Sequence, residues 1–254
     1  MHPSQLRQEI RESARSYAQS HDLDVDCSWK SAIIFRDLAD ALHRPSFDAI
    51  CDNEIWRCRT KKSHQQIDGV KEMQSSNSSD ALLMSIFCHP ELSSWKGVAD
   101  VLGFSPTEPE FGYKPRVAKK GTNGDETEID MAIDGYFVEA KLTETDFTEK
   151  AVAEVEKYEG LASCFHTECL CICDGRFQNY QVIRNLLAST QHRKHHMLLC
   201  DERRPDLVRR YMKTVCCLRD EQMRKGCRVV FWQEIWRACG RDLGDFLQAR
   251  YGLR

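Results

Sequence analysis

The segment from Thr127 to Leu142, TEIDMAIDGYFVEAKL, leaves this chain few ways to fold. Two runs of alternating apolar and polar residues flank the dipeptide Asp134-Gly135. Such a dipeptide is a strong signal for a two-residue hairpin turn, in which both central positions need positive φ. The turn then determines which residues face each other across the two strands: Ile133 and Tyr136, Ala132 and Phe137, Met131 and Val138, Asp130 and Glu139, and Glu128 and Lys141.

The hairpin is predicted to have one apolar face and one charged face, because side chains alternate between faces along a strand. The apolar face would hold Ile129, Met131, Ile133, Val138, Ala140 and Leu142. The charged face would hold two directly facing pairs, Asp130 with Glu139 and Glu128 with Lys141.

The facing pair of carboxylates, Asp130 and Glu139, indicates a metal site. Two like charges directly opposite each other destabilise a sheet. A divalent cation removes this repulsion, and Mg²⁺ is typically held by one or two carboxylates together with water and substrate phosphate. The neighbouring Lys141 could orient or help to deprotonate an attacking water, or stabilise charge on a phosphate. The alternative is an exposed hairpin whose charged face is only solvated.

The same residues resemble a known signature. Asp130, eight intervening residues and then Glu139-Ala140-Lys141 are similar to the D…(D/E)-x-K motif of the PD-(D/E)XK nuclease superfamily, which has the restriction-endonuclease-like fold. The longer string TEID…VEAKLTETDF resembles a group of bacterial restriction endonucleases, and the likeness extends more weakly from about Gln74 to Trp236. The Pro-Asp pair of the superfamily is absent, since Ile129 precedes Asp130.

The resemblance implies a role for each residue of the motif. Asp130 and Glu139 would hold Mg²⁺ or Mn²⁺, helped by the backbone carbonyl of Ala140. Lys141 would position and activate water. Its reference pKa of about 10.4 must shift for it to act as a full base, so orientation and charge stabilisation are its favoured roles.

Members of the superfamily often add residues to this site from other elements. A further acidic residue commonly comes from the preceding helix or the first strand, and here Glu110 is the first choice, Glu108 the rival and Glu128 the fallback. Related nucleases also place a glutamine on a later helix facing the metal, and Gln181 matches it in type and location. The alternative hypothesis is that Gln181 is an exposed glutamine on the helix surface with no part in the site.

The predicted fold is α/β, a restriction-endonuclease-like core with a mixed central sheet of about four to five strands flanked by helices. Residues 1–75 are predicted to form an N-terminal helical extension and residues 76–254 the nuclease core. Helices are expected over 4–20, from Asp26 or Ser28 to before Pro45, from Ser46 onward, over 80–102 with a break near Pro90, over 149–161, 180–187 and 205–215, and up to Arg250. Further strands are expected over 110–117, 196–200 and 227–232.

Composition sets broad limits on the class of protein. A chain of 254 residues is long enough for one good core. Its net charge of −3 gives no global attraction to nucleic acid, so any binding surface must be local. No run approaches the roughly eighteen apolar residues of a membrane span, and the N-terminus does not begin like a signal peptide. Thirteen cysteines without a secretory signal indicate reduced thiols in a cytoplasmic protein.

Four of these cysteines, Cys164, Cys169, Cys171 and Cys173, lie close together in the sequence. Their spacing is not a standard zinc or iron–sulfur pattern. The last three would share one face of a strand, which gives a row rather than a tetrahedron. Buried or partly buried reduced thiols are therefore preferred over a metal site, which stays an alternative.

The sequence thus predicts a Mg²⁺- or Mn²⁺-dependent nuclease that hydrolyses phosphodiester bonds, with DNA as the first choice of substrate, in restriction, defence or repair. Nucleic acid is the expected partner, and no membrane contact is expected. The chain could also form a homodimer. The runner-up is a catalytically silent nucleic-acid-binding or scaffold protein that retains the nuclease fold.

Overall fold

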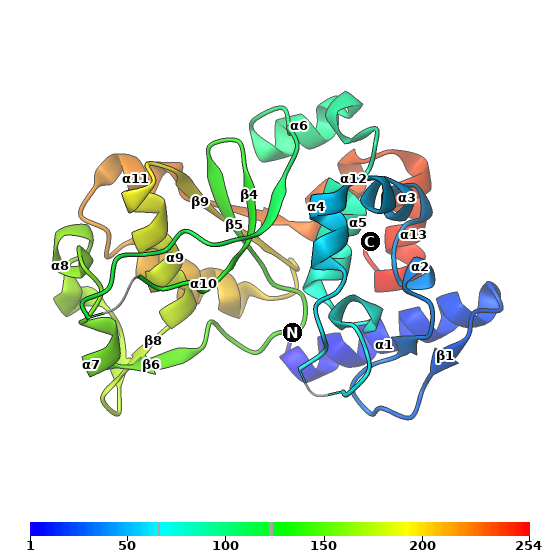
Figure 1. Ribbon diagram of the computed structural model, residues 1–254, viewed down its shortest axis with the longest axis horizontal. Helices are drawn as coiled ribbons and strands as arrows, with labels where there is room; N and C mark the ends of the chain where they lie inside the picture. The colour runs from blue at the N-terminus through cyan, green and yellow to red at the C-terminus, as the bar shows by residue number, and fades with distance from the viewer. Residues whose placement is uncertain (66, 122–123) are drawn as a thin grey trace.

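The computed structural model describes residues 1–65, 67–121 and 124–254. Its centre is a five-stranded sheet in the order β10-β9-β5-β4-β3 (Figure 1). The strands are β3 (Glu110–Tyr113), β4 (Ile129–Ile133), β5 (Tyr136–Ala140), β9 (His195–Cys200) and β10 (Arg228–Phe231). β4 is antiparallel to both β3 and β5, whereas β9 pairs in parallel with β5 and β10 pairs in parallel with β9. This mixed sheet, flanked by helices, confirms the predicted fold class.

The hairpin forms with the predicted register. Met131 pairs with Val138, Ala132 with Phe137 and Ile133 with Tyr136. Asp134 has the positive φ expected of the turn, at 47°, but Gly135 does not share it. One of the two predicted turn conformations is therefore found.

Both faces of the hairpin are covered by protein, which differs from the prediction of one apolar and one charged face. Met131, Val138 and Leu142 belong to one core cluster, as predicted. Ile129, however, packs with Ala132 and Phe137 in the cluster on the other face. Gly112 of β3, between the pairs Phe111–Met131 and Tyr113–Ile129, has a φ of +65°, which departs from extended strand geometry beside Ile129. A strand between two packed layers is apolar on both sides, so the charges are confined to one end of the hairpin.

Helices from the N-terminal and C-terminal parts of the chain together cover one face of the sheet. They are α1 (Pro3–Ser20), α5 (Ser79–Phe87), α6 (Lys96–Leu102), α12 (Trp232–Ala238) and α13 (Arg241–Tyr251). Figure 1 shows α1, in blue, beside the red α13. Leu6 and Ile10 of α1 are fully buried in the same cluster as Leu247 and Trp232. The predicted break near Pro90 is present, because α5 ends at Phe87 and α6 begins at Lys96.

The other face is covered by α9 (Tyr180–Gln191) and α10 (Pro205–Val215), with α11 (Glu221–Gly226) at the side of β9. The order hairpin, helix α9, strand β9 is the predicted one. A separate three-stranded sheet lies in the order β6-β8-β7 (Glu149–Ala151, Arg176–Gln178, Ile172–Cys173). Within the ranges that the structure describes, no helix is long and apolar enough to cross a membrane.

Two predicted helices are wrong. The stretch from Asp26 to Pro45 forms a short β1–β2 pair (Val25–Asp26, Ile34–Phe35) and only one turn of helix, α2 (Leu38–Ala41). Here the backbone N–H of Ile33 donates to the Ser76 hydroxyl (3.0 Å), so a tertiary contact replaces a helical hydrogen bond. The helix from Ser46 is found as α3 (Arg44–Asp52), followed by α4 (Glu54–Arg59).

The second wrong helix is 149–161, where strand β6 is followed by the short helices α7 (Val152–Val155) and α8 (Leu161–Cys164). The cysteine row is also not a single strand face, since Cys169 ends a 3₁₀ turn and only Cys173 lies in β7. Cys164 is buried as expected, whereas Cys169, Cys171 and Cys173 are exposed rather than packed.

Candidate active site

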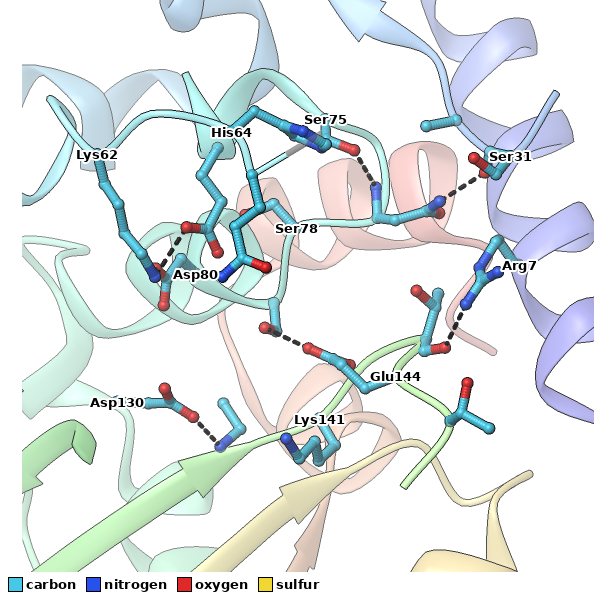
Figure 2. Close-up of a pocket in the computed structure, with 18 of the residues that line it drawn as sticks. Arg7, Ser31, Lys62, His64, Ser75, Ser78, Asp80, Asp130, Lys141 and Glu144 are labelled. Carbon is cyan, nitrogen blue, oxygen red and sulfur yellow. Dashed lines mark hydrogen bonds and ion pairs between the residues drawn. The ribbon is translucent and has the colours of Figure 1, made fainter. Parts of the chain in front are cut away.

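The charged end of the hairpin opens into a cleft of about 770 Å³. Asp130 of β4, Glu139 and Ala140 of β5, Lys141 just after β5, and Gln181 of α9 all line this cleft. The fold therefore brings together the central motif and the predicted helical glutamine, which lie far apart in the sequence. Figure 2 shows Asp130 and Lys141 at neighbouring strand ends, with Asp80 on the helical wall opposite them.

Glu139 is a buried carboxylate of the cleft, with 3% of its surface exposed. Its Oε1 lies 2.8 Å from Nζ of Lys141, and its Oε2 accepts a hydrogen bond from Nδ2 of Asn185 (2.7 Å). Burial by itself would raise the pKa of Glu139, but the Lys141 ammonium and its hydrogen bond outweigh it, so the pKa is lowered. Glu139 is therefore a carboxylate at neutral pH.

Asp130 has the opposite electrostatic character. Its Oδ2 accepts the backbone N–H of Ala140 (2.8 Å), which holds it against β5. Burial, and then the charges of Glu139 and Asp80, raise the pKa of Asp130 well above its usual value. A second negative charge is thus unfavourable here unless a cation joins it. The Ala140 carbonyl is directed to the same side as its N–H, because both groups of a strand residue point to one neighbour.

Lys141 is enclosed between the carboxylates and the core. Its Nζ donates to Oε1 of Gln181 (3.0 Å), and its carbonyl accepts the indole N–H of Trp232 (2.9 Å). Burial would lower the pKa of Lys141, but Glu139 first, then Glu144 and Asp130, raise it. Lys141 is consequently protonated at neutral pH. Trp232 is a core anchor as predicted, with no exposed surface.

Helix α9 supports the site with two side chains one turn apart, Gln181 and Asn185. Gln181 accepts from Lys141, and Asn185 donates to Glu139. The buried Arg184 fixes the orientation of Asn185, because its Nε donates to Asn185 Oδ1 (3.0 Å). Asn185 was not predicted from the sequence, although its i+4 spacing from Gln181 places it on the same face of the helix.

A further acidic residue does reach the cleft, but it is Asp80 and not the predicted Glu110. Asp80 lies in the first turn of α5, which Ser78 caps through the backbone N–H of Ala81 (3.1 Å). It is buried, with Arg59 Nη2 at 2.9 Å and Lys62 Nζ at 3.5 Å from its Oδ2. The acidic first turn after a serine cap was the available sequence signal.

The three acidic residues proposed from the sequence lie elsewhere. Glu110 is exposed on β3 and is not among the residues that line the cleft. Glu108 accepts from Asn53 Nδ2 (2.8 Å). Glu128 pairs with Arg59 and not with Lys141, so the predicted Glu128–Lys141 pair is wrong. Arg59 can lie against β3 because Gly112 has no side chain. A Cβ added at Gly112 would lie 2.6 Å from Nη1 of Arg59.

The donor set of the cleft fits a hard divalent cation. Carboxylates outnumber cations among the lining residues, with Glu72, Asp80, Asp130, Glu139, Glu144 and Asp146 against Arg7, Lys62 and Lys141. Two carboxylates and a backbone carbonyl at one strand end are ligands that Mg²⁺ accepts, with water completing the shell. Among the residues that the structure describes, Asp80, Asp130 and Glu139 are not a set whose ligand atoms all lie within 4.8 Å of one another. The ion would therefore rely on Asp130, Glu139 and Ala140.

Comparison with known families gives the context for this geometry. A family model described as Restriction Endonuclease associating with ARP matches residues 7–252. The chain belongs to this family. The match spans nearly the whole chain, so the family includes the N-terminal helix as well as the central sheet. The restriction-endonuclease-like character inferred from the TEID…VEAKL motif is confirmed. No curated protein and no solved structure matches the chain.

Proposed function

We propose that this member of the restriction endonuclease family is a Mg²⁺- or Mn²⁺-dependent nuclease that hydrolyses phosphodiester bonds in DNA. The observation that carries the proposal is the convergence of Asp130, Glu139 and Lys141 on one cleft. The raised pKa of Asp130 beside an ionised Glu139 is a second support, since a divalent cation would relieve that repulsion. Asp130, Glu139 and the Ala140 carbonyl would hold the ion.

Each protein group then has a distinct task. Lys141 is held in place by Glu139 and Gln181 and keeps its proton, so it orients the attacking water and stabilises negative charge on the phosphate. Asn185 keeps the Glu139 carboxylate from rotating. When bound, Mg²⁺ would polarise the scissile phosphate and make water a better nucleophile at neutral pH. Asp80 adds negative charge to the cleft and is balanced by Arg59 and Lys62.

Replacement of Lys141 tests the proposal. Lys141→Met keeps an unbranched side chain of similar bulk but removes the positive charge, so cleavage of plasmid DNA in MgCl₂ should fall about 10²–10⁴-fold. DNA binding, measured by gel shift on the same preparation, should stay within a few-fold of the parent. The matched control is Lys213→Ala, which removes an exposed lysine of α10 and should leave cleavage unchanged.

Three outcomes would contradict the proposal. Cleavage that survives EDTA would exclude the metal. Loss of binding together with cleavage would make Lys141 a phosphate contact. A parent protein that binds DNA but cuts neither DNA nor RNA in Mg²⁺ or Mn²⁺ would favour a catalytically silent binding protein.

The family description names an association with ARP. We infer that this chain also acts together with such a partner. The homodimer stays a prediction, and sedimentation of the purified chain with and without the partner would decide it.

A further inference from the structure

A cluster of metal-binding side chains lies outside the catalytic cleft and has no part in the proposed reaction. It consists of His43, His89 and Asp242, whose ligand atoms all lie within 4.8 Å of one another. His43 is the residue before α3, His89 follows the end of α5, and Asp242 is in the first turn of α13. None of the three lines the catalytic cleft. We propose that these residues form a second metal site, which takes Zn²⁺ or a similar transition-metal ion.

The ligand types favour zinc over magnesium. Two imidazoles and one carboxylate suit Zn²⁺, Ni²⁺ or Cu²⁺, whereas Mg²⁺ prefers a shell of oxygens. Nε2 of His43 lies 3.0 Å from Oδ2 of Asp242. Two ligands at about 2.1 Å from a tetrahedral zinc ion are about 3.4 Å apart, so this pair is already close to the required separation.

The surroundings of His43 can accommodate the tautomer that the ion needs. The Ser46 hydroxyl donates to the carbonyl of Ser85 (2.6 Å), so its oxygen, 3.5 Å from Nδ1 of His43, can accept a hydrogen bond from a proton that moves to that nitrogen. Histidine ligands in metal sites usually donate their second ring N–H in this way. In the metal-free protein Nε2–H of His43 donates to Oδ2 of Asp242 (3.0 Å), so binding of the ion through Nε2 moves the ring proton to Nδ1, beside the Ser46 oxygen.

His89 has to reorganise for the ion to bind. Its Nδ1 accepts the backbone N–H of Glu91 (3.1 Å), so Nε2 carries the ring proton in the metal-free protein. Ligation through Nε2 moves that proton to Nδ1 and breaks the contact with Glu91. This cost places the affinity below that of a preformed structural zinc site. Trp95, whose ring centroid is 4.5 Å from that of His89, and His43 on the other side hold the ring in place.

Asp242 makes the site accessible and gives a clean test. Its side chain is 80% exposed, in contrast to the two buried rings, so an ion enters from solvent and keeps a water as its fourth ligand. Asp242→Asn removes the charged ligand but retains an acceptor for His43, so the fold is preserved. The matched control is Asp245→Asn, an exposed carboxylate on the same helix with 71% of its side chain accessible.

The experiment is a calorimetric titration of EDTA-stripped protein with ZnCl₂. Excess MgCl₂ occupies the oxygen-lined cleft, and a phosphine reductant keeps the thiols reduced. The parent and Asp245→Asn should each bind one zinc ion. Asp242→Asn should bind that ion with an affinity at least about tenfold lower. His89→Gln should show the same loss. The proposal is overturned if Asp242→Asn and Asp245→Asn bind zinc alike, which would place the ion on the exposed cysteines or in the cleft. It is equally overturned if the parent binds none with a Kd below about 100 µM.

Discussion

The two proposed metal ligands should respond oppositely when their charges are removed in the absence of metal. Glu139 is the only carboxylate within salt-bridge distance of Lys141 among the residues that the structure describes. In Glu139→Gln, the charged Lys141 loses its ion-pair partner although only 6% of its side chain is exposed to solvent. The new amide also directs its N–H₂ toward Nδ2 of Asn185, and Asn185 cannot rotate freely because Arg184 donates to its Oδ1. Removing one partner of a buried ion pair costs about 3–5 kcal/mol.

Asp130→Asn should instead leave stability unchanged or raise it. At a separation of about 5 Å and an effective dielectric constant of about 20, two carboxylates repel by about 3 kcal/mol. The substituted amide would still accept the Ala140 N–H through its oxygen, but the bond loses its charge-assisted part, about 1 kcal/mol. The net gain is about 1–2 kcal/mol. Both variants should fail to cut DNA, because each lacks one of the charges that would hold the metal.

Urea unfolding in EDTA, followed by tryptophan fluorescence, measures both effects. With a slope of about 3 kcal/mol per molar urea, the midpoint of Glu139→Gln should fall by about 1–1.7 M and that of Asp130→Asn should rise by about 0.3–0.7 M. Glu156→Gln, an exposed carboxylate, is the control and should match the parent. Equal destabilisation of the two variants, or a loss of more than about 1 kcal/mol in Asp130→Asn, would refute this account of the charges.

Two further results are expected. Burial and the neighbouring charges raise the pKa of Asp130 in the folded protein above 3.8, so the folded protein holds this proton and loses stability as pH rises through the folded pKa. The advantage of Asp130→Asn should therefore vanish near pH 4 and grow as pH rises in urea titrations. An advantage that persists at pH 4 would count against this assignment. Asp80→Asn should lower the free energy of unfolding by about 1–3 kcal/mol, because the buried Arg59 loses one of its two carboxylate partners and retains only Glu128. Asp100→Asn, at an exposed aspartate, is the control and should leave stability unchanged. A thermal scan in EDTA compares the two, and equal melting temperatures would show that the Asp80 pair contributes nothing.

The hairpin and its motif could be predicted because their information is local. The Asp134-Gly135 turn sets the register, and the register alone places Asp130 opposite Glu139. The succession of strand and helix signals then allowed Gln181 to be placed on the helix that follows. These expectations needed no knowledge of distant contacts.

Elements that depend on distant contacts could not be predicted from periodicity. The stretch after Asp26 has apolar residues at helical spacing, yet Ile33 bonds to Ser76 and the chain forms a β-bridge there instead. In the same way, Glu149 to Ala151 pairs with β8, a strand whose position the local pattern does not reveal. Tertiary pairing overrides helix propensity at both places.

Asp80 was not predicted as a residue of the cleft for a related reason, and its position clarifies the role of the N-terminal part. Glu110 was preferred because it is close to the hairpin in sequence, but the register of β3 places it opposite Ala132. Asp80 reaches the cleft because α5 packs across the sheet.

Arg59 and Lys62 balance the charge of Asp80. Both belong to residues 1–75, the segment predicted to be an N-terminal helical extension. Without them, Asp80 would add an uncompensated buried charge beside Asp130, whose pKa it already raises. Arg59 also pairs with Glu128, directly before β4, so the same side chain ties the start of β4 to the helix that carries Asp80. We therefore infer that the N-terminal part is a component of the active site, because it sets the charge against which the carboxylates of the cleft must bind their ion.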